Sequence, residues 1–172
     1  MSSEILAAIL GALLAGGLQT IIAIVDRRRE RETILTAIAS EVDSICRLIR
    51  HQRYLEYSNL LCEKIRSDSW EGDAFVIDIR SNYFSVYEGL VAKLGNLEPK
   101  AAAKIVNFYA YCKSIIDSVR PDGPHSAAPS TLDSAANMIS MNLTLRAVLQ
   151  LGDEIIQLPK IQIFDMSTQT LQ

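Results

Sequence analysis

The sequence is poor in the residues that carry most enzyme chemistry. It has only two histidines, His51 and His125, and three cysteines, Cys46, Cys62 and Cys112. It contains no glycine-rich phosphate loop and no HExxH or GxSxG motif, and no carboxylate pair stands at an evident catalytic spacing. We therefore predict a protein that is not an enzyme, holds no metal or cofactor and has no small-molecule substrate.

Cysteine pairs and aromatic residues are also scarce, and the net charge is small. An odd number of cysteines without a CxxC pair is unlike a secreted disulfide framework or a zinc site, so we expect reduced thiols in a core or an interface. Aromatic content is 6%, and a formal net charge of -3 gives no overall attraction to nucleic acid. The hydrophobic residues are mainly Ala, Leu and Ile, a composition that favours helices.

Charge is absent from the 21 residues between Ile5 and Val25. As a helix this run is about 31 Å long, which matches a hydrocarbon core about 30 Å thick. The four residues before the run carry an acid and no base, unlike a cleavable signal peptide. We therefore predict a transmembrane anchor over residues 1–26.

Basic residues follow the predicted span directly: Arg27, Arg28, Arg29 and Arg31. The positive-inside rule then predicts a short N-terminus outside and a cytoplasmic body. Each arginine is also expected to gain about 1 kcal/mol near an anionic membrane surface.

The predicted span has two different faces. Leucine and isoleucine fall mainly on one side, as a lipid-facing surface requires, and the other side carries Gly11, Ala12, Ala15, Gly16, Gln19 and Thr20. Small residues let helices approach closely, and amide and hydroxyl groups can bond between helices. We expect this face to meet other copies of the chain or a wet lumen, since a single span can enclose a pore only by cyclic assembly. The alternative is that Ala and Gly are simply common in membrane spans.

The rest of the chain predicts an all-α antiparallel four-helix bundle over residues 27–158. No proline or glycine occurs between Leu18 and Gly72, so one helix is expected to leave the membrane and continue to about Arg66. Apolar residues at helical spacing predict a second helix over residues 75–94.

Glycine and proline residues predict where the remaining helices begin and end. Gly95 is expected to end the second helix as a left-handed cap, and a proline to open the third, over residues 99–119. A linker over 121–129 precedes a fourth helix, which is expected to stop after Gln157 at a Leu-Pro pair. The tail, 159–172, is expected to be partly disordered or to add a short strand.

Arg120 and His125 are separated by four residues at the end of the third predicted helix. This spacing is similar to the R-x4-6-H motif of the HEPN superfamily, helical bundles in which two copies of the motif cleave RNA without metal. There the histidine can transfer a proton and the arginine can stabilise charge on phosphate. Pro121 takes the place of the polar residue usual in that family, so an ordinary solvated loop is the favoured interpretation. A membrane-tethered, metal-independent RNase is the alternative.

A second basic cluster lies on the predicted cytoplasmic part of the first helix and consists of Arg47, Arg50, His51 and Arg53. It could bind phosphates, a nucleotide or a cytosolic partner, which would make the chain a receptor or scaffold. The favoured alternative is a solvated face whose charge is balanced by Glu41, Asp43 and Glu56.

Taken together, one N-terminal span, a short basic stop, a helical body and the motif at Arg120 and His125 resemble the accessory membrane proteins of RNA-targeting type VI-B CRISPR systems. The resemblance is architectural over most of the length. It implies ring-shaped multimers that enclose a pore and depolarise the membrane during phage infection, with the HEPN-like motif in a structural role. We therefore expect a homo-oligomeric single-pass protein of the bacterial inner membrane that acts in antiviral defence. Its expected partners are its own copies, the bilayer and a cytosolic defence protein or RNA.

Overall fold

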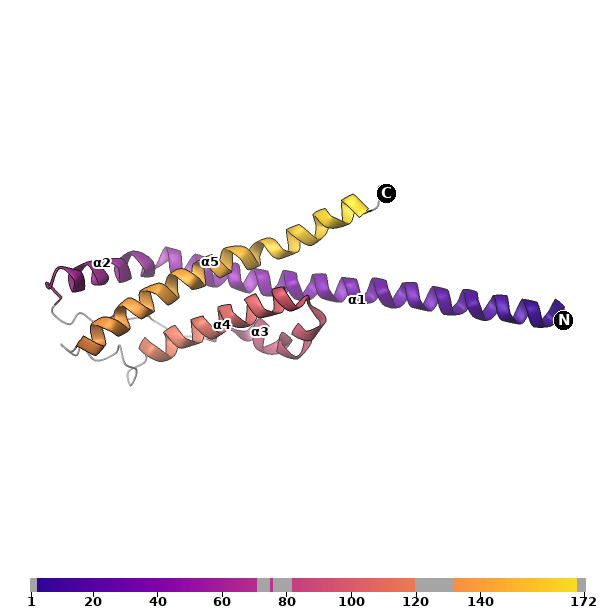
Figure 1. Ribbon diagram of the computed structural model, residues 1–172, viewed down its shortest axis with the longest axis horizontal. Coiled ribbons are helices and arrows are strands. Elements are labelled where there is room, and N and C mark those ends of the chain that lie inside the picture. Colours follow the sequence, from indigo (N-terminus) through magenta and orange to yellow (C-terminus); the bar gives the residue numbers. More distant parts are fainter. Residues whose placement is uncertain (1–2, 71–74, 76–81, 120–131, 170–172) are drawn as a thin grey trace.

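The chain is helical in nearly all of the part that the structure describes (Figure 1). This computed structural model describes residues 3–70, 75, 82–119 and 132–169; within the helices, side chains are described from residue 16 onward and, in the last helix, over 135–159. No strand occurs in these ranges. The predicted all-α class is confirmed.

The first helix, α1 (Ser3–His51), is 49 residues long. The prediction that it continues to Arg66 is wrong, because the chain turns at Arg53 before α2 (Tyr54–Arg66) begins. Arg53 has left-handed backbone angles, φ 57° and ψ 32°, and its amide donates to the carbonyl of Arg50 at 3.1 Å. One left-handed residue redirects the chain even though the sequence offers neither proline nor glycine there.

Of the second predicted helix, over residues 75–94, residues 76–81 lie outside the described part of the chain. Phe75 is outside any helix, and the described helical segment consists of α3 (Ser85–Leu90) continued by the 3-10 helix η1 (Val91–Asn96). Phe75 is instead a core side chain, 1% exposed, whose ring lies 6.1 Å from that of Tyr54. The prediction of a left-handed Gly95 is also wrong, since this residue lies inside η1 without a positive φ.

The last two helices run the length of the bundle. The predicted third helix is confirmed as α4 (Pro99–Val119), and the predicted linker at 121–129 lies outside the described residues. The predicted stop at Pro159 is wrong, because α5 (Leu132–Gln169) continues through it, so the expected disordered tail or strand is helical up to Gln169. A proline inside a helix removes one amide donor and its ring presses on the carbonyl four residues earlier, a cost of about 3 kcal/mol that does not end α5 here.

The core lies where α5 packs against α1 and α4, with α2 against its first half. Among its most buried side chains are Ile38, Val42, Ile105, Phe108, Leu145 and Val148. At Gly152 α5 comes close to α1: a Cβ there would overlap the Sγ of Cys46 and lie 3.2 Å from the Phe108 ring. The body is therefore a helical bundle in which the close approach of α5 to α1 depends on one glycine.

The N-terminal part of α1 extends beyond the body (Figure 1). On this helix the first buried side chain of the described part is Ile34, and every described side chain from Gly16 to Arg29 is exposed. At 1.5 Å per residue, the stretch from Ser3 to Thr33 measures roughly 45 Å. We call the exposed part of α1 before Ile34 the projecting segment.

Candidate functional site

The projecting segment carries large apolar side chains that nothing in the described part of the chain covers. The exposed fractions are 61% for Leu18, 60% for Ile21, 52% for Ile22, 61% for Ile24 and 40% for Val25. Five such residues within eight positions form a continuous apolar surface, which soluble monomers rarely present. The segment therefore requires an apolar environment or a partner.

The small residues of the predicted span occupy the other side of this helix. Gly16, Gln19 and Thr20 are exposed, and the space around the Gly16 Cα is open. The Thr20 hydroxyl donates to the carbonyl of Gly16 at 2.9 Å, so its proton is satisfied within the helix. Ile21 and Ile24 flank Gly17 instead, which places this second glycine on the leucine and isoleucine side.

The predicted span can be followed only in part. Most of it, residues 5–15, lies outside the described side chains, and with it the predicted face residues Gly11, Ala12 and Ala15. Among the residues that the structure describes, no helix is both long enough and apolar enough to cross a membrane. The transmembrane anchor stays a prediction.

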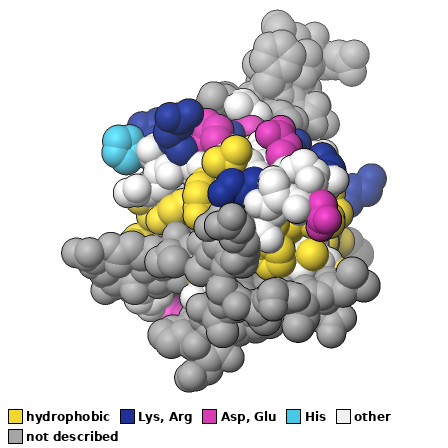
Figure 2. Space-filling model, turned by 90° about the vertical axis from the view of Figure 1, so that its left-hand side faces the viewer, with side chains coloured by type: hydrophobic (Ala, Val, Ile, Leu, Met, Phe, Trp, Pro, Cys, Tyr) yellow, Lys and Arg dark blue, Asp and Glu magenta, His cyan; other side chains and the backbone are white. Residues whose placement is uncertain are grey.

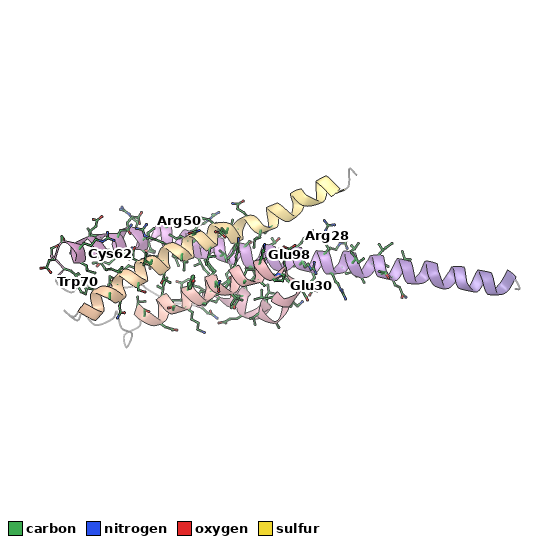
Figure 3. All side chains as sticks on the ribbon, viewed as in Figure 1. Arg28, Glu30, Arg50, Cys62, Trp70 and Glu98 are labelled. Atoms are coloured by element: carbon green, nitrogen blue, oxygen red, sulfur yellow. The ribbon has the colours of Figure 1, made fainter. Side chains whose placement is uncertain are left out.

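Four exposed arginines surround α1 where the projecting segment meets the body, and we call them the arginine collar: Arg27, Arg28, Arg29 and Arg31. Figure 3 shows Arg28 and Glu30 at this junction. The Nε of Arg28 lies 3.8 Å from a carboxylate oxygen of Glu32, one turn along the helix. The residues predicted to flank a membrane thus mark the boundary between projecting segment and bundle.

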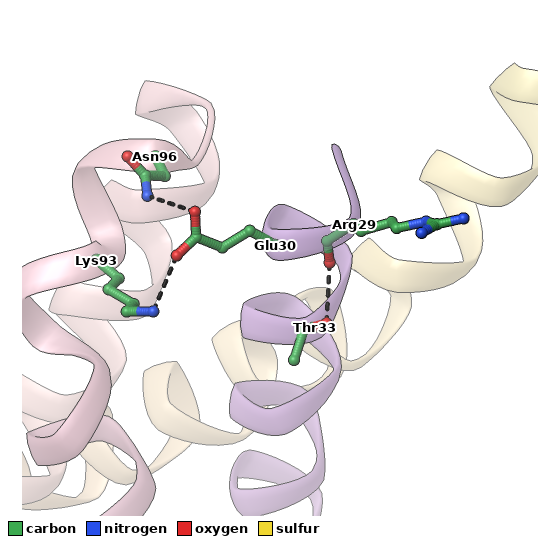
Figure 4. Close-up of polar contacts among 5 residues, drawn as sticks. All are labelled: Arg29, Glu30, Thr33, Lys93 and Asn96. Carbon is green, nitrogen blue, oxygen red and sulfur yellow. Dashed lines mark hydrogen bonds and ion pairs between the residues drawn. The ribbon is translucent and has the colours of Figure 1, made fainter. Parts of the chain in front are cut away.

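Glu30 lies within the collar sequence but points away from it. Its carboxylate accepts a hydrogen bond from the Lys93 ammonium at 2.9 Å and one from the Asn96 side-chain amide at 3.4 Å, both on η1 (Figure 4). Arg29 extends from the opposite side of α1. This acid therefore ties η1 to the base of the projecting segment.

The second basic cluster is largely engaged within the chain. Arg50 makes a bidentate contact with Asp153 of α5, at 2.7 and 2.8 Å, and Arg47 lies 2.8 Å from Asp43. Arg53 is 4.0 Å from Glu56. Figure 2, which looks onto the end of the body away from the projecting segment, shows basic side chains interspersed with acidic and uncharged ones.

The structure describes the three predicted thiols but not the two catalytic candidates. Arg120 and His125 lie outside the described residues, so the nuclease alternative stays a prediction. The three cysteines are buried and unpaired, as expected. Burial raises the pKa of Cys46 to about 11 and that of Cys112 to about 12, which keeps both protonated and unreactive at neutral pH.

The role of Glu41 differs from the prediction that this acid balances the second basic cluster. Its half-buried carboxylate instead joins three helices, accepting hydrogen bonds from the Val86 amide at 2.7 Å, the Tyr87 amide at 3.0 Å and the Tyr109 hydroxyl at 2.6 Å. The Tyr87 ring stacks on that of Tyr109, with centroids 3.9 Å apart. The signal in the sequence was that Glu41, an acid, lies among the apolar residues that line one face of α1.

A second missed feature is a polar network between α2 and α5. The buried side-chain amide of Asn142 donates to the Ser58 hydroxyl at 3.0 Å and to the Asn59 side-chain oxygen at 2.9 Å. Arg146 completes it with hydrogen bonds to the side-chain oxygens of Asn142, at 3.0 Å, and Asn59, at 2.6 Å. Such satisfied networks fix how two helices pack, and nothing here points to a ligand.

The fold and the site together define a helical-bundle protein with a long N-terminal helix that carries an exposed apolar segment and an arginine collar. No protein-family model, curated protein or solved structure matches this chain. The function must therefore be argued from the geometry.

Proposed function

We propose that the chain is a single-pass membrane protein whose copies associate through the projecting segment to form a ring that opens a path across the membrane. The observation that carries the proposal is the exposed apolar surface from Leu18 to Val25, which is separate from the core of the body. Transfer of such side chains out of water is worth roughly 1.5–3 kcal/mol each when burial is complete. A bilayer provides that burial along the whole charge-free run.

The second part of the proposal, association, rests on the two faces of the segment. A lipid-facing surface accounts for Leu18, Ile21 and Ile24, while Gly16 and Thr20 would contribute little area to it. Open space at Gly16 allows another helix to approach closely, and Gln19 supplies an amide that would be costly to leave unpaired in hydrocarbon. We propose that Gly16, Gln19 and Thr20 face neighbouring copies around the ring.

Membrane insertion is tested on the full chain expressed in bacteria. Alkaline carbonate washing of the membranes removes peripheral proteins, and we expect the chain to stay in the pellet. Protease added to intact spheroplasts should leave the body undigested if it is cytoplasmic. Release of the chain by carbonate would contradict the anchor.

Association is tested with a matched pair of glycine variants. Gly16→Leu and Gly17→Leu add the same side chain at neighbouring positions that are both open in the single chain. We expect Gly16→Leu to lower the particle mass in detergent and Gly17→Leu to leave it unchanged, because only Gly16 lies on the small face. A monomeric wild type, or equal masses for both variants, would remove the ring from the proposal.

A conducting path is tested by membrane potential in living cells. We expect expression of the wild type with its trigger to depolarise the membrane and admit a small dye, and Gly16→Leu to prevent both. The resemblance to type VI-B accessory proteins extends the proposal to antiviral defence, for which phage challenge supplies the trigger. Full polarisation of challenged cells that express the wild type would exclude the path.

A further inference from the structure

We infer that the arginine collar binds the phosphate groups of anionic lipid headgroups, so that the protein prefers an anionic leaflet. The inference rests on the proposed membrane anchor and names the ligand class that its flank recognises.

The first support is that the neighbouring acids are occupied. Glu30 is held by Lys93 of η1 at 2.9 Å, and Glu32 is the acid nearest to Arg28. Arg27, Arg29 and Arg31 make no ion pair within the described part of the chain. Three guanidinium groups then remain against the single carboxylate of Asp26, a local net charge of +2.

The second support is the depth at which the collar stands. It begins two residues after the exposed apolar Val25, and Arg27 and Arg31 are separated by about 6 Å along the helix axis. The headgroup region on each side of a bilayer is about 5–8 Å thick. If Val25 ends the hydrocarbon-facing surface, the collar lies at the level of the lipid phosphates.

The third support is the direction in which the arginines leave the helix. Arg27 and Arg31 are one turn apart on one side, and Arg29 points roughly the opposite way, away from Glu30 (Figure 4). Arg29 therefore continues the leucine and isoleucine side that faces lipid, while Arg27 and Arg31 continue the side of Gly16 and Thr20, so the three arginines reach phosphates beside and between copies of the ring. One soluble anion would instead require the side chains to converge.

The choice of arginine adds chemical selectivity, since the collar contains no lysine. A guanidinium group is planar and binds two phosphate oxygens at once, whereas an ammonium group acts as a point charge. We therefore expect both the charge and the shape of the group to matter.

The test uses the full chain in a neutral detergent, titrated with phosphatidylglycerol or phosphatidylcholine and followed by native mass spectrometry. We expect phosphatidylglycerol to bind at least tenfold more tightly. The triple variant R27Q/R29Q/R31Q should lose this preference, at about fivefold per arginine removed. These residues precede the first buried residue of α1, so the body should keep its unfolding temperature.

The matched control, R47Q/R53Q/R66Q, removes three exposed arginines from the body and should keep the lipid preference. R27K/R29K/R31K keeps the charge and should bind several-fold more weakly than the wild type. Equal affinity for the two lipids, or equal loss in both glutamine triples, would overturn the collar as a headgroup site. Unchanged affinity in the lysine triple would overturn the guanidinium assignment.

Two further measurements separate the sources of failure. Inorganic phosphate should displace phosphatidylglycerol no better than sodium chloride of equal ionic strength; specific displacement would indicate a soluble-anion site and overturn the lipid assignment. If the wild type resists carbonate extraction but binds both lipids equally, the headgroup site is contradicted and the membrane anchor is not. A carbonate-soluble wild type would end the anchor itself.

Discussion

At the scale of single residues, Glu41 shows how one side chain can hold several elements together. Its two carboxylate oxygens accept hydrogen bonds from the first amides of α3 and from the Tyr109 hydroxyl of α4. No side chain of α3 itself caps that helix, and none of its residues is fully buried. The position of α3 therefore depends strongly on this acid.

We expect Glu41→Ala to lower the free energy of unfolding by about 2–4 kcal/mol, because it removes three acceptors from part-buried donors. Urea unfolding followed by circular dichroism measures the change. Asp43→Ala is the matched control on the same helix; it breaks only an exposed pair with Arg47 and should cost at most about 1 kcal/mol. Equal losses in the two variants would show that the Glu41 contacts add nothing to stability.

The role of Glu41 could be predicted only in part. Its place on the stripe that contains Ile34, Ile38 and Ile45 indicated that the side chain faces inward, yet the arginines nearby in sequence suggested a surface pair. Its true donors are 45 to 68 residues away in the sequence. Local patterns do not contain such distances, because they are set by how α3 and α4 come to rest on α1.

At the scale of elements, α5 is fitted to α1 through Gly152. A Cβ at this position would overlap the Cys46 sulfur and press on the Phe108 ring. The ring and the sulfur both belong to the buried core, so neither can move aside freely. The close spacing of α1 and α5 therefore depends on the absence of a side chain at Gly152.

We expect Gly152→Ala to destabilise the body by about 1–3 kcal/mol through overpacking, despite the better helix propensity of alanine. Gly89→Ala is the matched control: it adds the same methyl group to α3, where the space is open, and should be neutral or slightly stabilising. Adding Cys46→Ala should recover part of the loss, since it removes the overlapping sulfur. Thermal unfolding of these three variants and of Cys46→Ala alone measures this coupling, and purely additive effects would contradict the overlap.

The helix boundaries show which local signals were sufficient. Pro99 correctly marked the start of α4, because its fixed φ and missing amide suit a first turn. Pro159 and Gly95 were misleading, since α5 continues past the proline and η1 includes the glycine. The turn at Arg53 had no glycine or proline to mark it. Only the structure shows this turn, in which the left-handed backbone of Arg53 lets α2 pack against α5.

At the scale of the whole molecule, the chain combines a body with a buried core and a helix that extends beyond it. Two of the buried thiols, Cys46 on α1 and Cys112 on α4, lie in that core. Because burial raises the pKa of both from the usual 9.0, they stay protonated in the folded body while they ionise in the unfolded chain. Their ionisation therefore couples the stability of the body to pH.

The sign of this coupling follows from the raised pKa values. The stabilisation is fully present below pH 9 and is lost as the pH rises toward 11 to 12, since the unfolded state then binds fewer protons than the folded state. Between pH 9 and 10 we expect a loss of about 1 kcal/mol per thiol in the free energy of unfolding. Urea titrations at both pH values measure it. Cys46→Ala with Cys112→Ala should abolish most of the dependence, and an unchanged slope would exclude the thiols as its cause.

The sequence by itself determined the helical class, the reduced cysteines, the start of α4 and the order of an apolar segment followed by arginines. These features arise from local propensity, composition and spacing, which act within a few turns of chain. Only the tertiary structure decided that Glu41 joins three helices, that Glu30 turns to η1 and that Gly152 sets the approach of α1 and α5. The physical reason is that each depends on groups brought together from distant parts of the chain. The apolar segment stayed uncovered in the fold, which is why the proposed function begins there.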